Sequence, residues 1–416
     1  MSDSSMRKKH ISFLPALAVF ALVCFIRHFK FTMSTYNTTF MALNYDYGFI
    51  PRGLMGTCFK YITEVYDKIG WDYMGVFNFN GFFTLLYFVL LFVFYKVCLS
   101  RCPETSKRNL KHLLVFLSVF TFPMYATSVS YGCLDLYLSI VLILSLILLV
   151  WGKGEWLILP LGIIGMCINH DFIFTHAMLI AALLVYKLLN CEGKGRIKYA
   201  TIVLLFVISS AALFSHFENY TYENPKEMAE EIKVSAKALS ETGKSYGKTY
   251  VYEEILGEDL SLTKERIEQN EDNLQDLPVF AALFSPYMIA MLYLFLLMFT
   301  DNSINWNRRI SYMVLLFGSV GILPMLFGDV YYGRYMFQLV FYYVSTFIVL
   351  ISLGENRTSE HFDVVKTDVK KLTPMTFVWF LYPFLLTPFR AVAISASIHD
   401  LAEILADPKL TYFIQP

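Results

Sequence analysis

Long apolar blocks alternate with short polar segments along almost the whole chain. A helix needs about 20 mainly apolar residues to cross the hydrocarbon core of a bilayer. Blocks that approach this length occupy residues 11–26, 79–97, 113–128, 135–151, 156–169, 172–188, 200–216, 279–300, 310–327, 335–353 and 374–394. The pattern therefore predicts an all-α protein, a polytopic integral membrane helix bundle with about 11 transmembrane helices. The arm 156–169 is short, so residues 156–188 fit either two full spans or a re-entrant hairpin.

The first block and the basic residues together predict how the chain is oriented. Block 11–26 follows Arg7-Lys8-Lys9-His10 and is not followed by a small-residue cleavage site, which is typical of an uncleaved signal anchor. With the N-terminus inside, the inner segments hold an excess of Lys and Arg, as the positive-inside rule requires. We therefore expect a cytoplasmic N-terminus and an extracytoplasmic C-terminus.

Two outer segments are long enough to carry structure of their own. In the first, residues 28–78, apolar residues from Gly53 to Val65 recur at helical spacing, which predicts a short helix lying in the membrane interface. The second, residues 217–278, is acidic, and Met228, Ile232, Ala236 and Leu239 form an apolar stripe in it. Leu260, Ile267, Leu274 and Leu277 suggest a second stripe. The predicted organisation is a membrane bundle over 1–216, a helical cap over 217–278 and a second membrane bundle over 279–416.

Composition supports this class and excludes others. Hydrophobic residues make up 56% of the chain and charged residues 16%, against about 25% charged in soluble domains. The 34 basic residues balance the 34 acidic ones, which argues against a nucleic-acid binder driven by basic charge. The seven cysteines are scattered and odd in number, so they predict neither a disulfide framework nor a zinc site.

Candidate chemistry gathers at span ends on the predicted outer side, where burying an ionisable group is costly. The candidates are Asp46, Tyr47 and Arg52 before the interfacial helix; His170 and Asp171, with Asn169, at the 156–188 tip; and Asp329, Tyr331, Tyr332 and Arg334 between two later spans. Weaker signals are Asp135, Arg390 and His399-Asp400. For each group a structural alternative stands beside the functional one: a local ion pair, a solvated tip, or an interfacial aromatic belt.

No cofactor is indicated. His170 and His176 are six residues apart and would not share a helix face, so no metal set is predicted, although a divalent metal fits the acids in principle. The segment from Gly243 to Thr249 resembles a phosphate loop but has three residues between its glycines, where the motif needs four.

The outer groups fit a lipid-phosphate substrate. Arg52 or Arg334 would bind the phosphate bidentately at headgroup level, and the tyrosines and His170 would line a sugar pocket. Asp46, Asp171 or Asp329 would deprotonate the hydroxyl of an acceptor.

Asp46 soon after the first span, the interfacial helix and the number of spans resemble the GT-C superfamily of polytopic membrane glycosyltransferases. The resemblance implies a polyprenyl-phosphate-linked sugar donor, a glycan or lipid-linked acceptor, and inverting transfer at the extracytoplasmic face of the cell membrane. Two departures are visible: Tyr47 follows Asp46 where a paired acid is usual, and the acidic loop lies mid-chain instead of in a C-terminal domain. The segments around Arg52, His170 and Arg334 also resemble those of uncharacterised bacterial envelope-polysaccharide proteins.

Two alternative functions remain beside the glycosyltransferase, together with a non-catalytic scaffold. A lipid-linked polysaccharide polymerase or ligase should carry arginines or histidines in its large outer loop, and residues 217–278 contain only Arg266. A transporter or flippase of envelope precursors predicts ionisable residues at mid-membrane depth, and the predicted spans are almost free of charge at their centres. An enzyme is therefore favoured.

Overall fold

The protein is helical throughout the part that its structure describes. The computed structural model describes residues 33, 35–66, 69–126, 132–220, 225–240, 292–301, 304–319, 321, 332–354, 358, 360, 361 and 363, and these form helices, turns and connecting segments without a β-strand. The predicted all-α class is confirmed at this level. The expected spans 11–26 and 374–394, the second apolar stripe of the cap and the loop from Gly243 to Thr249 lie outside the described residues.

From α2 to α9 the described helices follow one another with short connections. In chain order the described helices are α2 (Thr35–Ala42), η1 (Tyr45–Tyr47), α3 (Gly53–Val65), α4 (Tyr73–Arg101), η2 (Glu104–Ser106), α5 (Lys107–Ala126), α6 (Leu134–Trp151), η3 (Glu155–Leu157), α7 (Ile158–Ile168), η4 (His170–Ile173), α8 (His176–Asn190), α9 (Lys194–Glu218), α10 (Pro225–Ala238), α14 (Trp306–Ser319) and α16 (Tyr332–Ser352).

Four described helical segments are long and apolar enough to cross a membrane. They are Tyr73–Arg101, Leu134–Trp151, His170–Asn190 and Lys194–Glu218, and each coincides with a predicted span. The segment Glu155–Ile168 is apolar but shorter, as its sequence predicted. Membrane character is therefore supported by four helices, while the expected total of about 11 stays a prediction.

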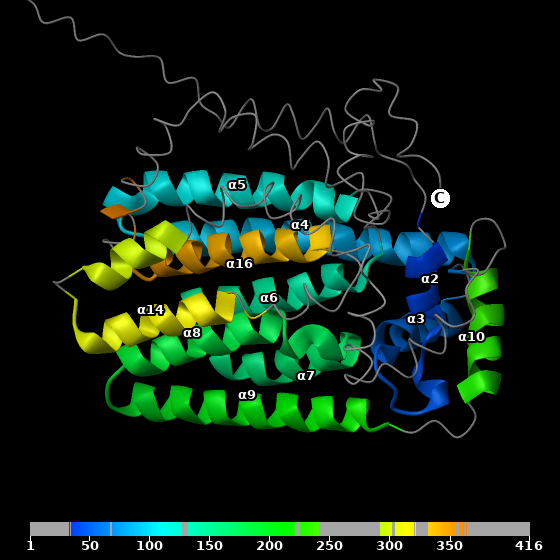
Figure 1. Cartoon of the computed structure of the whole chain (residues 1–416). Coiled ribbons are helices and arrows are strands. Elements are labelled where there is room, and N and C mark those ends of the chain that lie inside the picture. Colours follow the sequence, from blue (N-terminus) through cyan, green and yellow to red (C-terminus); the bar gives the residue numbers. More distant parts are fainter. Residues whose placement is uncertain are drawn as a thin grey trace, which may run out of the picture.

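The long helices lie side by side in a bundle, and α2, α3 and α10 gather at one end of it (Figure 1). We call this the capped end. We call the opposite end of the bundle the basic end. There, Arg101 of α4 donates a hydrogen bond of 2.8 Å to the carbonyl oxygen of Trp151, the last residue of α6. Lys198, the fifth residue of α9, lies at the basic end too, where it donates a hydrogen bond to Glu155 between α6 and α7.

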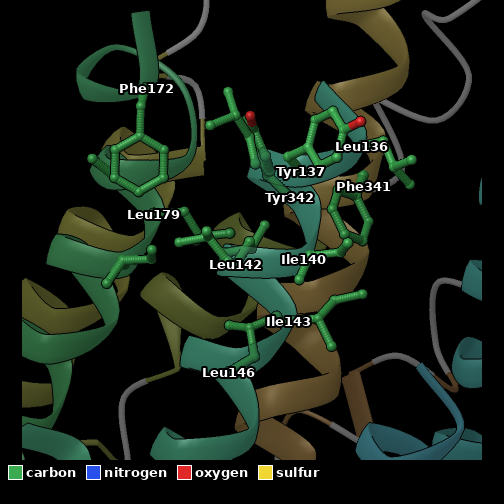
Figure 2. Close-up of a cluster of buried hydrophobic side chains, with 14 of the residues drawn as sticks. Leu136, Tyr137, Ile140, Leu142, Ile143, Leu146, Phe172, Leu179, Phe341 and Tyr342 are labelled. Carbon is green, nitrogen blue, oxygen red and sulfur yellow. The ribbon is translucent and has the colours of Figure 1, made fainter. Parts of the chain in front are cut away.

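Helix α6 forms the centre of the bundle. Its sequence is apolar on all sides, which predicts a helix covered all round, and most of its residues are buried. Figure 2 shows the buried side chains of Leu142 of α6 beside Leu179 of α8, and of Ile140 of α6 beside Phe341 of α16. Helices α4 and α9 instead expose many large apolar side chains, as expected of surfaces that face lipid: Phe82, Leu85, Val89 and Phe92 on α4, and Leu204, Val207 and Ile208 on α9.

Helix α3 has the bounds predicted from its spacing, Gly53–Val65. It buries Met55, Gly56 and Phe59, and a Cβ added at Gly56 would lie 1.8 Å from the carbonyl oxygen of Leu43, so α3 packs directly on the backbone that follows α2. On the other side of α3, Tyr61 and Val65 are both exposed. This pairing of one buried face with one exposed apolar face agrees with a helix that lies at the membrane interface.

Helix α10 covers α2 from outside. Ile232, Ala236 and Leu239, all predicted members of the stripe, are almost fully buried, and so is Ala229. Helices α10 and α2 pack against each other. Helix α10, the described helix of the predicted cap, thus packs on α2, which belongs to the segment 28–78.

Candidate functional site

A tight turn places Arg52 at the start of α3. Asn44 caps η1 by accepting a hydrogen bond from the Asp46 amide at 2.9 Å, and the chain then reverses at Gly48, whose φ is 97°. Arg52 itself has φ 64°, in the left-handed region that side-chain-bearing residues adopt at a cost. Strained backbone of this kind is held in place by its surroundings and clusters at functional sites.

The break between α7 and α8 places the second half of the site. Asn169 ends α7 and caps η4, with its Oδ1 accepting from the Asp171 amide at 3.2 Å. The hydroxyl of Thr175 donates to the Asp171 carbonyl at 3.0 Å and so closes the turn before α8. The predicted hairpin tip is therefore an ordered turn that presents two polar side chains on adjacent positions.

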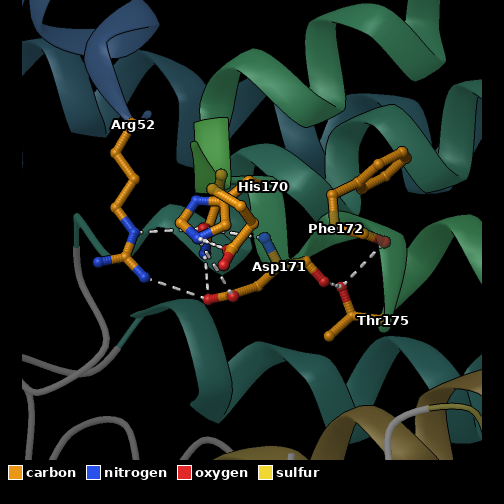
Figure 3. A network of polar contacts seen from close by, with 7 residues as sticks. Arg52, His170, Asp171, Phe172 and Thr175 are labelled. Carbon is orange, nitrogen blue, oxygen red and sulfur yellow. Dashed lines mark hydrogen bonds and ion pairs between the residues drawn. The ribbon is translucent and has the colours of Figure 1, made fainter. Parts of the chain in front are cut away.

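Arg52 and Asp171 meet across 119 residues of sequence (Figure 3). Arg52 Nη2 donates to Asp171 Oδ2 and Arg52 Nε donates to Asn169 Oδ1, both at 3.2 Å. Asn169 Nδ2 also donates to Asp171 Oδ2, at 3.2 Å. The guanidinium is almost buried and its carbon lies 5.9 Å from the centre of the Phe40 ring. The arginine and the carboxylate thus hold each other in fixed positions.

His170 extends this cluster to the end of α9. Its Nε2 lies 3.4 Å from Glu218 Oε1 and 3.9 Å from Asp171 Oδ1, so one imidazole nitrogen faces two carboxylates. Arg52, Asn169, His170, Asp171 and Glu218 together form what we call the Arg52–Asp171 network. With a neutral imidazole it carries one more negative than positive charge, and a protonated imidazole balances it.

Sequence reasoning missed Glu218. It stands two residues after the predicted span 200–216, so the same rule that selected Asp171, an ionisable residue at a span end, would have selected it. It was instead counted among the many acids of the outer loop.

Aromatic side chains fasten the Arg52 turn to α9. His216 Nε2 lies 3.2 Å from the Phe49 carbonyl oxygen, and the two rings stack with centroids 5.3 Å apart. The Phe217 ring lies 5.2 Å from Phe49 and 6.4 Å from His170. The turn and the end of α9 are therefore held together next to the network.

Asp46 and Tyr47 lie at the capped end but make other contacts. The Asp46 carboxylate pairs with Lys60 of α3, and both side chains are exposed. That hydrogen bond raises the pKa of Lys60. Burial, with a smaller contribution from Glu231 of α10, raises the pKa of the Tyr47 phenol. Asp46, the predicted first-loop acid, thus pairs with Lys60 and not with Arg52, although only five residues lie between Asp46 and Arg52 in sequence.

The third predicted group is only partly described. Asp329 and Tyr331 lie outside the described residues, as do Arg390, His399 and Asp400, while Tyr332 and Arg334 belong to the first turn of α16. Asp135 is buried in the first turn of α6, where it accepts from the Cys133 thiol at 3.3 Å.

His176 belongs to a different cluster from His170, as their spacing predicted. It is fully buried, and its ring nitrogens lie 3.4 Å from Ser139 Oγ, 3.1 Å from Thr175 Oγ1 and 3.2 Å from the Tyr342 hydroxyl. Across the described ranges, no three His, Cys, Asp or Glu side chains come close enough to hold a metal ion.

The Arg52–Asp171 network combines two kinds of chemical group. The Arg52 guanidinium can donate charge-assisted hydrogen bonds to an oxyanion. The carboxylates and the His170 imidazole beside it can accept a proton.

Comparison of the chain with protein-family models, with curated proteins and with solved structures found no match in any of the three.

Proposed function

We propose that the protein is a membrane glycosyltransferase that uses a polyprenyl-phosphate-linked sugar donor at the extracytoplasmic face, in the synthesis of a cell-envelope polysaccharide or glycoconjugate. One observation carries the proposal. Arg52, His170 and Asp171, selected separately as phosphate-binding and proton-accepting residues, lie in one network at the capped end.

The position of the network suits a lipid-linked substrate. It lies where α7 and α9 end and α8 begins, next to α3 with its exposed Tyr61 and Val65. The polyprenyl chain would lie along apolar helix surfaces, which leaves its phosphate at the level of the helix ends. A phosphate at that depth would meet Arg52 without leaving the interface.

Arg52 is assigned to the donor phosphate. Its planar guanidinium matches a phosphate group, and it can bind two oxygens at once. Asp171 and Asn169 hold the guanidinium in the absence of substrate. A bound phosphate would share it with Asp171 and loosen its hold on that carboxylate.

Asp171 is assigned as the general base. Its carboxylate would accept the proton of the acceptor hydroxyl, whose oxygen then attacks the anomeric carbon and forms the new glycosidic bond. The bond from that carbon to the phosphate oxygen breaks, and the electron pair leaves with the lipid phosphate. Arg52 would stabilise this developing charge. His170, held by Glu218, would hydrogen-bond a hydroxyl of the sugar or the acceptor.

The decisive experiment incubates the purified protein with polyprenyl-linked sugars and candidate acceptors and follows product mass by mass spectrometry. Asp171→Asn should lower kcat by about 10²–10⁴-fold, the usual contribution of a general base. Arg52→Lys should raise KM for the donor. Asp363→Asn is the matched control, because Asp363 pairs loosely with Arg108, at 3.9 Å, far from the network.

Two results would contradict the proposal. One is full activity in Asp171→Asn. The other is a wild-type protein that forms no product with any donor. Movement of the donor across a vesicle membrane without a change in its mass would identify a transporter instead.

A further inference from the structure

The basic end of the bundle brings cations from several helices together. Arg101 comes from α4, Lys187 from α8 and Lys198 from α9, and Lys153 lies in the turn after α6. Arg101 is tied to the end of α6 through the Trp151 carbonyl. This cluster is remote from the Arg52–Asp171 network and plays no part in the function proposed above.

A single buried acid, Glu155, sits among these cations and is already engaged. Its side chain is 1% exposed, and it accepts hydrogen bonds from Lys198 Nζ and the Tyr199 hydroxyl, each at 2.7 Å. Glu155 balances the charge of Lys198 but has no oxygen left without a strong donor. Glu155 is also a charged neighbour of Lys187, but among the described residues it accepts hydrogen bonds from Lys198 and Tyr199 and not from Lys187.

Lys187 is the side chain that needs explaining. It is half-buried in α8, a helix long and apolar enough to span the membrane, and its charged neighbours are Glu155, Lys198 and Arg101. Within the described part of the chain, no carboxylate, carbonyl or hydroxyl accepts a hydrogen bond from its ammonium group. A partly buried cation beside two others is costly unless an anion joins them.

The surface around this cluster indicates where the anion comes from. Trp151 and Trp156 are 48% and 46% exposed, and the Lys153 ammonium lies 6.0 Å from the Trp151 ring centre. Exposed tryptophans are typical of the headgroup level of a bilayer. Ile197 on α9 is exposed close by, which extends the apolar rim.

We infer that the basic end holds the phosphate of an anionic membrane lipid, with Lys187 and Lys198 as its principal contacts and Arg101 beside them. Basic pockets between transmembrane helices on the cytoplasmic side bind anionic headgroups in this way. The acyl chains would lie against the exposed apolar surface around Trp156. A free phosphate ion has the same charge and oxygens, so the test has one arm for each source.

Native mass spectrometry of the full chain in detergent provides the test. The protein is mixed with equal amounts of phosphatidylglycerol and phosphatidylcholine, and the fraction retaining each lipid is measured as collision energy rises. The wild type should retain phosphatidylglycerol preferentially. Lys187→Gln should lower its affinity about fivefold, the effect expected for one cation near an anionic surface.

Lys111→Gln is the matched control, because it removes an exposed lysine from the first turns of α5 and should leave retention unchanged. Displacement of the lipid by millimolar inorganic phosphate in the wild type but not in Lys187→Gln would assign the cations to free phosphate. Equal retention of the two lipids, or retention unchanged in Lys187→Gln, would overturn the inference. None of these results depends on glycosyl transfer.

Discussion

Replacing Arg52 by alanine tests whether the Arg52–Asp171 network also holds the capped end together. To partners among the described residues the guanidinium donates two hydrogen bonds of 3.2 Å, and the side chain is 7% exposed. Removing one partner of a buried ion pair costs about 3–5 kcal/mol, because the other charge stays buried. Since the Asp171 side chain is 21% exposed, water can solvate its carboxylate and so reduce this loss of stability. We expect Arg52→Ala to lower the free energy of unfolding by about 3 kcal/mol.

Arg52→Gly separates the contribution of the side chain from that of the backbone. Arg52 is the only non-glycine residue with positive φ in the described ranges, and alanine keeps the resulting strain of about 1–2 kcal/mol. Glycine adopts this conformation without that strain. Both variants lack the guanidinium, but only alanine keeps the strain. The free energy of unfolding of Arg52→Gly should therefore be about 1 kcal/mol larger than that of Arg52→Ala.

Both variants can be measured by denaturant unfolding in detergent, with tryptophan fluorescence as the signal. Lys60→Ala is the control at the same end, because it removes an exposed cation paired with Asp46 and should change stability by about 0.5 kcal/mol or less. Arg52→Ala as stable as Lys60→Ala would refute the idea that the network stabilises the fold. Arg52→Gly less stable than Arg52→Ala would refute the assignment of strain.

Three further predictions concern other parts of the fold. Gly56→Ala should lower the unfolding temperature, because the added Cβ would lie 1.8 Å from the Leu43 carbonyl and force α3 away. Burial alone would raise the pKa of Glu155, but hydrogen bonds, chiefly from Lys198, outweigh it and hold that pKa below its ordinary value. Ionised Glu155 should thus stabilise the fold at neutral pH, and this contribution should be lost as pH falls below about 4.5. The unfolding temperatures of Glu155→Gln and the wild type should therefore converge in acid. Val234 of α10 is 69% exposed, so Val234→Cys should react with a membrane-impermeant maleimide added outside intact cells.

Each of these has its own control. Gly195→Ala, where the nearest atom is 3.5 Å away, should be tolerated, and equal effects at both glycines would contradict the packing argument. Glu192→Gln, an exposed acid, should leave the pH profile unchanged. Arg108→Cys, at the basic end, should stay unlabelled from outside. Labelling of Arg108→Cys with protection of Val234→Cys would reverse the predicted orientation.

Periodicity predicted the elements at the capped end well. The bounds of α3 and the buried stripe of α10 follow from apolar spacing alone, because a helix that packs on one side must repeat every three to four residues. The break at Asn169 was also visible as polar residues between two apolar blocks. These are local properties, which is why the sequence carries them.

Contacts across the chain could not be predicted in the same way. Placing Arg52 and Asp171 on one side of the membrane does not say that they touch, since that depends on how α3 lies against α7. Asp46 shows the reverse case: it is close to Arg52 in sequence, yet the first turns of α3 bring Lys60 to it instead. Glu218 was overlooked because its significance depends on His170, a residue of another hairpin.

The long sequence separation inside the network has a consequence for biogenesis. Arg52 is synthesised 119 residues before Asp171, and Glu218 emerges later still, after all of α9. During that interval the strained turn at Arg52 lacks the partners that hold it. A nascent chain halted after α8 would contain Arg52, Asn169 and Asp171 but would lack Glu218, one of the two carboxylates that His170 faces. Completion of the capped end is therefore a late event, because the contact between His170 and Glu218 can form only after α9 has been made.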